Sequence, residues 1–431
     1  MSQLSSGINE RLAFLSSASI CPFIFKINEQ LQRQNKKAYE PEILGVGPYY
    51  RKKVNLQMME VHKLRYLDEL LKRRNESVDR YLEALKNLEK EARNYYAEPI
   101  KLNKDKFVEM MLLDGCFIIE LFRKFNNPTS RYEHDPIFQI LNIRKSIRRD
   151  LLLFENQIPL FVLIQLIDMT ENSNQGNPQD ILARWALNFF RATISSFSRS
   201  QTSNNQPTTI PKYNDRHLLS LVHDAWYSLI AEKGNVIVIP LSSGTDKSHE
   251  FIKSVTELRE AGIKFKKTEC SSLLDVKFEN GIMEIPPLRV DDDTEWLFRN
   301  LIAYEQYSGE TGNTYMTDYM TFMDCLLNSP KDVEILRHSG IIDNWLGDDK
   351  VVSTMFNKMC NHILVNVDSE TFYYRKVFKE VNEYCKHRRH GWMAFPRYNY
   401  CNSPWSILSV TVATVFLLLT VIQTGCSILQ V

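Results

Sequence analysis

The residues with the clearest capacity for chemistry are acids and amides set within apolar stretches. Asp114 falls on the apolar stripe of an expected helix, and Glu155, Asn156 and Gln157 stand between two apolar runs in DLLLFENQIPLFVLIQLI. An ionised carboxylate buried alone costs several kcal/mol, so each acid must be paired or hydrogen-bonded. Pro159 removes the amide that would bond the Glu155 carbonyl, so we expect a kinked helix whose freed carbonyl takes a donor from the neighbouring side-chain amides.

We interpret these five residues as a structural polar cluster rather than a catalytic site. No nucleophile or second acid has a defined spacing to Glu155, and polar groups in a protein core are normally hydrogen-bonded. The alternative is an enzyme with an unrecognised active site around Asp114 and Glu155. His62 or His223 would then be a further participant, although ordinary hydrogen bonding explains both histidines equally well.

Familiar signatures of catalysis and of cofactor binding are absent from the sequence. It contains no GxxxxGK[ST], HExxH or GxSxG motif. Gly45 and Gly47 of ILGVGPYY lack the third glycine of a dinucleotide site, and Pro48 blocks the helix that would hold a phosphate. We therefore interpret ILGVGPYY as a turn, and we expect no cofactor and no catalytic activity.

A basic segment precedes the C-terminal apolar stretch. Cysteine and histidine at 385, 387, 390 and 401 carry ligand chemistry, but their spacing fits no familiar site and the basic residues among them repel a cation, so we expect no metal. Basic residues near a bilayer contribute about 1 kcal/mol each to its binding. Four side chains are predicted to contact lipid head groups: Lys386, Arg388, Arg389 and Arg397. Cys401 is a candidate for lipidation, with a free thiol as the alternative.

The C-terminus predicts a transmembrane helix. Residues 405–429 include no Asp, Glu, Lys, Arg or His, and a helix of that length rises roughly 37 Å. Basic residues precede this stretch and none follows it, which places the preceding body in the cytosol. The expected topology is a single-pass tail anchor in a membrane that the sequence does not identify. The alternatives are a buried C-terminal helix and a tail that docks into a partner's groove.

Composition limits the compartment and the partners. Lys and Arg number 53 against 52 Asp and Glu, a net charge of +1, so no global field recruits nucleic acid. The eight cysteines form no CxxC pair, which is typical of a reduced body facing the cytosol. The N-terminus lacks the basic start and apolar block of a secretory signal. We expect membrane lipid and an unidentified protein as partners.

Hydrophobic periodicity predicts a mainly α body with one small β-sheet or hairpin. Apolar side chains recur at helical spacing over 56–71, over 78–96 and after Asn103. Further along, NVIVIPL is typical of a short strand, and LLDVKF and IMEIPPLRV, joined by Asn280-Gly281, predict a hairpin. The expected divisions are an N-terminal lead (1–19), a helical lobe (20–194), a flexible polar linker (195–215), a second helical lobe with the sheet (216–384), a basic collar (385–404) and the transmembrane helix (405–429).

In these features the chain resembles the plant family called domain of unknown function 247, from about Ile20 to its C-terminus. Eight blocks occur in family order, among them AYEPEILGVGPYY, DLLLFENQIPLFVL and SGIIDNWLG, and Tyr50 stands where many members carry His. The resemblance implies a plant protein with membrane association, and it brings no established catalytic residues. Some members lie at grass self-incompatibility loci, so a self-recognition role is implied by analogy alone.

The function predicted from all of these features is a binding one. We expect a tail-anchored plant membrane protein that acts as a protein-interaction module in signalling or recognition. The enzyme around Asp114 and Glu155 remains the alternative.

Overall fold

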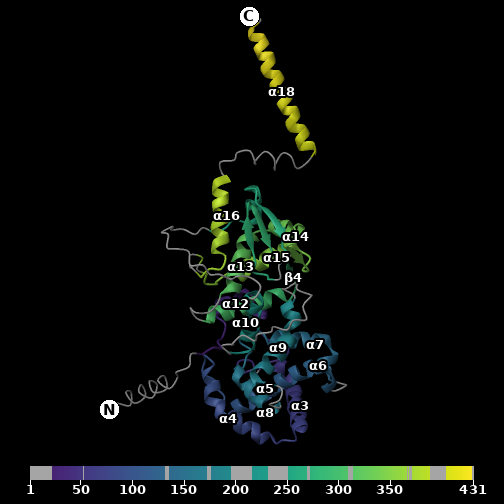
Figure 1. Cartoon of the computed structure of the whole chain (residues 1–431), viewed down its shortest axis with the longest axis vertical. Helices are drawn as coiled ribbons and strands as arrows, with labels where there is room; N and C mark the ends of the chain where they lie inside the picture. Colours follow the sequence, from purple (N-terminus) through teal and green to yellow (C-terminus); the bar gives the residue numbers. More distant parts are fainter. Residues whose placement is uncertain are drawn as a thin grey trace, which may run out of the picture.

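The computed structural model describes residues 22–51, 53–131, 135–171, 176–195, 216–231, 251–268, 272–308, 314–365, 367, 371–388 and 404–429. Helices dominate these residues and the strands are few and short, as predicted for the body. The earlier helices gather at one end of the molecule and the strands lie toward the other, while the C-terminal helix stands apart from both (Figure 1).

The N-terminal half is built from helices and short 3-10 turns. They are α2 (Glu29–Gln34), η1 (Lys36–Ala38), η2 (Val54–Leu56), α3 (Gln57–Arg74), α4 (Val78–Asn94), α5 (Lys104–Asn126), η3 (Pro128–Ser130), α6 (Pro136–Gln139), α7 (Leu141–Asp150), α8 (Leu160–Thr170) and α9 (Pro178–Ser195). Helix α5 is central, because it packs against α3, α4, α8 and α9. Its side chains from Met110 to Phe122 are all buried, as expected for a helix enclosed by others.

Helix boundaries in this half follow the capping residues of the sequence. The Asn103 side chain accepts a hydrogen bond from the Lys106 amide and begins α5. Asn75, between α3 and α4, takes a left-handed conformation with φ of 53° and ends α3. The helices predicted over 56–71 and 78–96, and the one predicted after Asn103, are therefore confirmed.

The C-terminal half mixes helices with two small sheets. Its helices are α10 (Leu218–Ala231), α11 (Val255–Glu260), α12 (Thr294–Tyr307), α13 (Tyr315–Leu326), α14 (Pro330–His338), α15 (Asp349–Met359), α16 (Arg375–Arg388) and α18 (Pro404–Leu429). Its strands are β1 (Lys264–Lys267), β2 (Lys277–Glu279), β3 (Ile282–Ile285), β4 (Leu288–Val290) and β5 (Ile342–Asn344). Buried side chains from both halves, between Ile24 and Val381, form one connected hydrophobic core.

The predicted hairpin is present, but it belongs to a larger arrangement. In the first sheet, β3 lies between a parallel β1 and an antiparallel β2. Asn280 and Gly281 join β2 to β3 with φ of 52° and 78°, as a two-residue hairpin turn requires. IMEIPPLRV is not one strand, because Pro286 and Pro287 have no amide to donate. Beyond them β4 pairs in parallel with β5, so the described residues hold two small sheets where the sequence predicted one.

The polar stretch before α8 is irregular, so the predicted kinked helix is wrong. Helix α7 ends at Asp150 and α8 begins at Leu160, with Pro159 in the capping position. We call residues 151–159 the polar loop. Two of its side-chain amides bond backbone carbonyls within or beside the loop, and such local bonds compete with helix formation.

The C-terminal helix does not meet the prediction made for it. Among the residues that the structure describes, no helix combines the length and the apolar character needed to cross a bilayer. Side chains of α18 are described over 411–423, where they are exposed. The predicted transmembrane helix over 405–429 is therefore wrong.

Other predicted segments lie outside the described residues. They are the N-terminal lead (1–19), residues 196–215 of the linker, the strand NVIVIPL, and the basic collar from residue 389 to residue 403.

Candidate functional site

The N-terminal segment, residues 22–56, lies across the polar loop and supplies most of its partners. Glu155 Oε1 accepts hydrogen bonds from the Ile27 amide at 2.6 Å and from Gln32 Nε2 at 3.1 Å. Glu155 Oε2 accepts one from the Tyr50 hydroxyl at 2.5 Å. The carboxylate therefore joins three points of the N-terminal segment to the loop. Tyr50, the residue that departs from the family pattern, is one of those points.

The two amides of the loop also bond backbone groups. Asn156 Oδ1 accepts from the Val46 amide at 2.7 Å, and its Nδ2 donates to the carbonyls of Leu44 and Asp150. Gln157 Nε2 donates to the carbonyls of two loop residues at 2.9 and 2.8 Å, and its Oε1 accepts from the Leu219 amide at 3.3 Å. Asn156 thus holds the N-terminal segment, while Gln157 holds the start of α10.

Asp150, at the end of α7, is a member of this cluster that the sequence analysis missed. Its carboxylate accepts hydrogen bonds from three successive amides, those of Glu42, Ile43 and Leu44, at 2.9 to 3.1 Å. Burial raises the pKa of Asp150 to about 6, although the amides and the neighbouring Arg149 oppose the rise. No sequence signal marks such an acceptor, because its partners are main-chain groups over a hundred positions away.

Asp114 is paired with a buried lysine. The Lys63 ammonium lies 2.6 Å from Asp114 Oδ1 and also contacts Glu60 Oε1 and the Gly45 carbonyl. Asp114 Oδ2 accepts from the Gly47 amide at 2.8 Å. Burial alone would lower the pKa of Lys63, but the two carboxylates outweigh it and raise that pKa. The ammonium therefore has an acceptor for each of its three protons.

Neither histidine of the alternative active site bonds Asp114 or Glu155. His62 lies on α3 where Arg65 and Asp135 are its charged neighbours, and burial followed by Arg65 lowers its pKa. His223 lies on α10 and pairs with Glu305. Asp114 and Glu155 instead bond the N-terminal segment and α3. Both acids therefore hold the N-terminal segment in place through hydrogen bonds, and neither histidine takes part in these bonds.

His223 belongs to a second buried polar cluster. Its Nε2 lies 2.8 Å from Glu305 Oε1, and its Nδ1 lies 3.1 Å from Asp224 Oδ1. Glu305 also accepts from the amides of Met316 and Thr317 and from the Thr317 hydroxyl. Burial lowers the pKa of His223, but its two carboxylate partners outweigh burial and raise that pKa to about 9. The protonated ring therefore ties α10 to α12, and Glu305 caps the first turn of α13.

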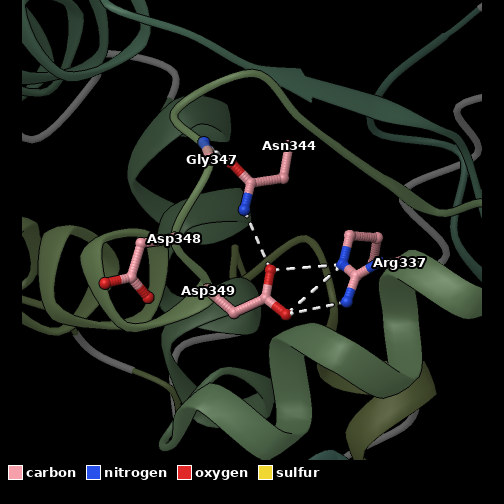
Figure 2. Close-up of a pocket in the computed structure, with 5 residues that line it drawn as sticks. All are labelled: Arg337, Asn344, Gly347, Asp348 and Asp349. Carbon is pink, nitrogen blue, oxygen red and sulfur yellow. Dashed lines mark hydrogen bonds and ion pairs between the residues drawn. The ribbon is translucent and has the colours of Figure 1, made fainter.

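A pocket of about 510 Å³ opens where α14, β5 and α15 meet, and it is lined by Arg337, Asn344, Gly347, Asp348 and Asp349. Figure 2 shows Asp349 between Arg337 and Asn344, with Asp348 pointing away from them. Asp349 accepts from the Arg337 guanidinium at 3.1 to 3.3 Å and from Asn344 Nδ2 at 2.9 Å. Burial would raise the pKa of Asp349, but these partners outweigh it and lower that pKa.

This pocket is poorly suited to chemistry. An ionised carboxylate held by a guanidinium is a weak base and a weak nucleophile, and the five lining residues include no Ser, Thr, Cys, Lys or His. The ion pair between Arg337 and Asp349 instead joins the end of α14 to the start of α15. Beside it, Trp345 is exposed and the Arg289 guanidinium lies 4.2 Å from the centre of its indole ring.

Helix α3 carries apolar residues on its outer face as well as on its buried one. Met59, Tyr66 and Leu70 face the core. Three apolar side chains on the other side of α3 are exposed, namely Met58 (80%), Val61 (67%) and Leu64 (56%), and so is Val54 (86%) in the preceding η2 turn. We call these four the α3 stripe. A signal for it was present in LQMMEVHKLRYL, where apolar residues recur on both sides of the helix rather than on one.

The remaining predicted residues lie at or beyond the end of α16. Lys386 is exposed, Arg388 is the last residue of α16, and Arg389, Arg397 and Cys401 lie outside the described residues. Contact of these residues with lipid, and lipidation of Cys401, stay predictions. Within the described part of the chain, no group of three or more His, Cys, Asp or Glu side chains is arranged to hold a metal ion.

Fold and site together define a mainly helical protein whose buried acids hold its own backbone and whose exposed α3 stripe faces outward. A family model described as a plant protein of unknown function, domain of unknown function 247, matches residues 24–419. The chain belongs to this family, as the sequence blocks had indicated.

Two curated relatives come from Arabidopsis thaliana. UPF0481 protein At3g47200 is 34% identical over 449 residues, which cover 99% of this chain and 90% of that protein. Putative UPF0481 protein At3g02645 is 22% identical over 485 residues, covering 93% and 89%. No solved structure matches the chain. The names of these relatives carry no activity that could be transferred.

Proposed function

We propose that this chain is a protein-interaction module, and that its binding surface is the α3 stripe. The observation that supports the proposal is the exposure of three large apolar side chains along α3, which is itself anchored in the core, and of Val54 in the turn before it. Monomeric proteins seldom expose contiguous apolar patches unless these bind something. An amphipathic helix of a partner, laid along α3, is the kind of occupant such a face accepts.

The rigidity of α3 also supports binding. Lys63 and Tyr66 hold its inner face through buried bonds to Asp114 and Asp135. A face fixed in this way loses little conformational freedom when a partner arrives. The exposed side chains of α18 have no such support, because that helix stands apart from the body (Figure 1).

The size of the stripe predicts modest affinity. Burying one Val, Leu or Met side chain contributes roughly 1.5 to 3 kcal/mol, and association itself costs about 4 kcal/mol or more. Four side chains therefore support a complex with a Kd that is about micromolar at its tightest, rather than a permanent one. A signalling or recognition role in plants, suggested by family analogy, fits a complex that forms and separates readily.

A charge placed in the stripe tests the proposal. We expect Val61→Glu in the tagged full-length chain, captured from native plant tissue, to lose the specific partners that the unchanged chain recovers. Val351→Glu is the matched control, because Val351 is an exposed valine on α15. Equal thermal stability of the two variants excludes misfolding. Partners retained by Val61→Glu but lost by Val351→Glu would move the binding surface to the α15 corner and contradict the proposal.

A further inference from the structure

Three partly buried arginines, Arg131, Arg144 and Arg148, lie together around α6 and α7. We call them the arginine cluster. Arg144 and Arg148 stand four residues apart on α7, so they share one face of that helix. The Arg131 guanidinium lies 4.6 Å from the centre of the Phe138 ring, and the Phe138 carbonyl accepts a hydrogen bond from Arg144 at 3.2 Å. One residue of α6 therefore contacts two arginines of the cluster.

Arg144 lies close enough to both of the other arginines to repel them. Burial lowers the pKa of Arg131 and of Arg148, and in both cases the charge of Arg144 lowers it further. Asp293 opposes the change in the pKa of Arg148, but this carboxylate already pairs with another residue. Like charges held together in this way favour the binding of an anion.

The arginine cluster has no carboxylate in an ion pair with it among the described residues. Its neighbours on α7 do pair with acids. Lys145 lies 3.0 Å from Asp293, and Arg149 lies 3.0 Å from Asp150. A partly buried positive charge without an opposite charge beside it is unfavourable. The cluster is therefore typical of a site for an external anion rather than of an internal ion-pair network.

Each guanidinium is held in place by neutral groups and keeps donors for a ligand. Arg131 bonds two carbonyls at the end of α5, and Arg148 bonds the Phe189 carbonyl on α9, all at 2.9 Å. Arg148 also lies 5.0 Å from the centre of the Phe189 ring. A guanidinium has five N–H groups, so most of those in the cluster remain unused. Their nitrogens are open to solvent, because the buried unbonded nitrogens of the described residues belong to other side chains.

We propose that the arginine cluster binds the phosphoryl group of a phosphate ester. A phosphoryl group carries a charge of about −1.5 to −2 and three strong acceptor oxygens, so it can bond three guanidinium groups at once. A carboxylate has one charge and two oxygens, and a single arginine satisfies it. The stacked rings and the carbonyl bonds orient the guanidinium planes before a ligand arrives, which reduces the ordering that binding requires. This site goes beyond the proposed function and does not depend on the α3 stripe.

Titration calorimetry with inorganic phosphate, at constant ionic strength, tests the site on the purified full-length chain. One binding event per chain is expected. Arg144→Gln should weaken it at least tenfold, because it removes the charge beside both other arginines. Arg131→Gln should do the same from a different segment of the chain, so that a disturbed α7 cannot explain the loss. Lys90→Gln is the matched control. It removes one positive charge from an exposed position on α4, across the helical end of the molecule from α7 (Figure 1), and should bind phosphate like the unchanged chain.

Two sources can present such a group, a soluble phosphate ester and a lipid head group, and vesicle flotation distinguishes them. Phosphatidylcholine vesicles with phosphatidylinositol monophosphate present a phosphate monoester, and vesicles with phosphatidylserine at matched surface charge do not. Recruitment by the first vesicles alone, lost in Arg144→Gln, would identify the head group. Phosphate binding without recruitment would identify the soluble ester.

The inference is overturned if the unchanged chain binds neither inorganic phosphate nor the phosphoinositide vesicles. It is also overturned if Arg144→Gln and Arg131→Gln bind phosphate as tightly as Lys90→Gln. Val61→Glu should bind phosphate like the unchanged chain, so a failure of the α3 stripe as a binding surface would leave this site standing.

Discussion

The Tyr50 hydroxyl lies 2.5 Å from Glu155 Oε2, so one hydrogen bond joins the N-terminal segment to the polar loop inside the core. Both side chains are buried. Burial raises the pKa of Tyr50, and the neighbouring Glu155 raises it further, so the phenol remains a donor at all ordinary pH values. Each oxygen of the Glu155 carboxylate thus has a hydrogen-bond donor. The bond from Tyr50 holds together two parts of the chain that are far apart in the sequence.

Removing the Tyr50 hydroxyl should lower the stability of the protein more than removing the Tyr49 hydroxyl. Tyr50→Phe is expected to lower the free energy of unfolding by about 1.5 to 3 kcal/mol, the range for a hydrogen bond to a charged group. Tyr49→Phe is the matched control, since the Tyr49 hydroxyl donates to the neutral carbonyl of Ile24 at 3.2 Å. It should cost about 0.5 to 1.5 kcal/mol. Urea unfolding measures both, and equal losses would mean that Glu155 is not the charged acceptor.

Breaking the Lys63–Asp114 pair should be among the most damaging single changes. Both side chains are about 2% exposed. Asp114→Asn leaves the ammonium buried beside a neutral amide, and removing one partner of such a pair typically costs about 3 to 5 kcal/mol. We expect a loss of this size in the free energy of unfolding, measured by urea denaturation.

The double change Lys63→Met with Asp114→Leu is the control for this loss. It removes both charges and keeps the volume of the side chains, so it should be less destabilising than Asp114→Asn alone. A double variant that loses as much stability as the sum of the two single changes would contradict the pairing.

The turn at Gly47 should reject any side chain. Its φ is 73°, and an added Cβ would lie 2.5 Å from the Gln157 carbonyl oxygen. Gly47→Ala therefore combines left-handed strain of about 1 to 2 kcal/mol with a clash against backbone. Gly176→Ala isolates the strain, because Gly176 has φ of 111° and open space around it. Thermal unfolding should show the larger loss for Gly47→Ala, and comparable losses would mean that the clash relaxes freely.

Local rules of the sequence predicted the parts of the fold that local residues decide. Asn103 begins α5 and Asn75 ends α3, because cap residues act on the amides and carbonyls beside them. Asn280-Gly281 makes its hairpin because both residues tolerate positive φ. Such signals lie within a few positions of the structure they determine.

Long-range partners account for what the sequence did not predict. The helical pattern over 150–167 suggested a kinked helix, but its side-chain amides bond carbonyls, and its carboxylates take amides from residues 27 to 44. The transmembrane prediction for 405–429 rested on the absence of charged residues, and no helix of the described residues meets the requirement of length and apolar character together. The types of the residues in the sequence were enough to pick out candidates for a polar cluster. The parts that Asp150, Tyr50 and Lys63 play in it became visible only in the structure.

The free energy of unfolding should fall as the pH rises and the buried His223 loses its proton. Besides Glu305 and Asp224, the ring faces Tyr304 and lies near His217, whose pKa burial lowers to about 3. The folded pKa of His223, about 9, exceeds the ordinary value of 6.5. The protonated His223 therefore contributes fully to stability below pH 6.5, and this contribution is lost as the pH rises through 9. The difference corresponds to about 3 kcal/mol in the free energy of unfolding.

A second group acts in the same direction at lower pH. Burial raises the pKa of Asp318, close to Glu305, to about 7. Folding therefore favours the neutral carboxyl, and the stability that this form contributes is lost as the pH rises through 7.

His223→Gln should flatten the decline in stability between pH 7 and 9 while leaving the decline below pH 7. The control His338→Gln alters an exposed histidine on α14 and should leave the whole profile unchanged. Urea unfolding from pH 5 to 9.5 gives the profiles. If His223→Gln keeps the full decline above pH 7, the buried imidazole is not the group that titrates there, and the tie from α10 to α12 does not depend on its charge.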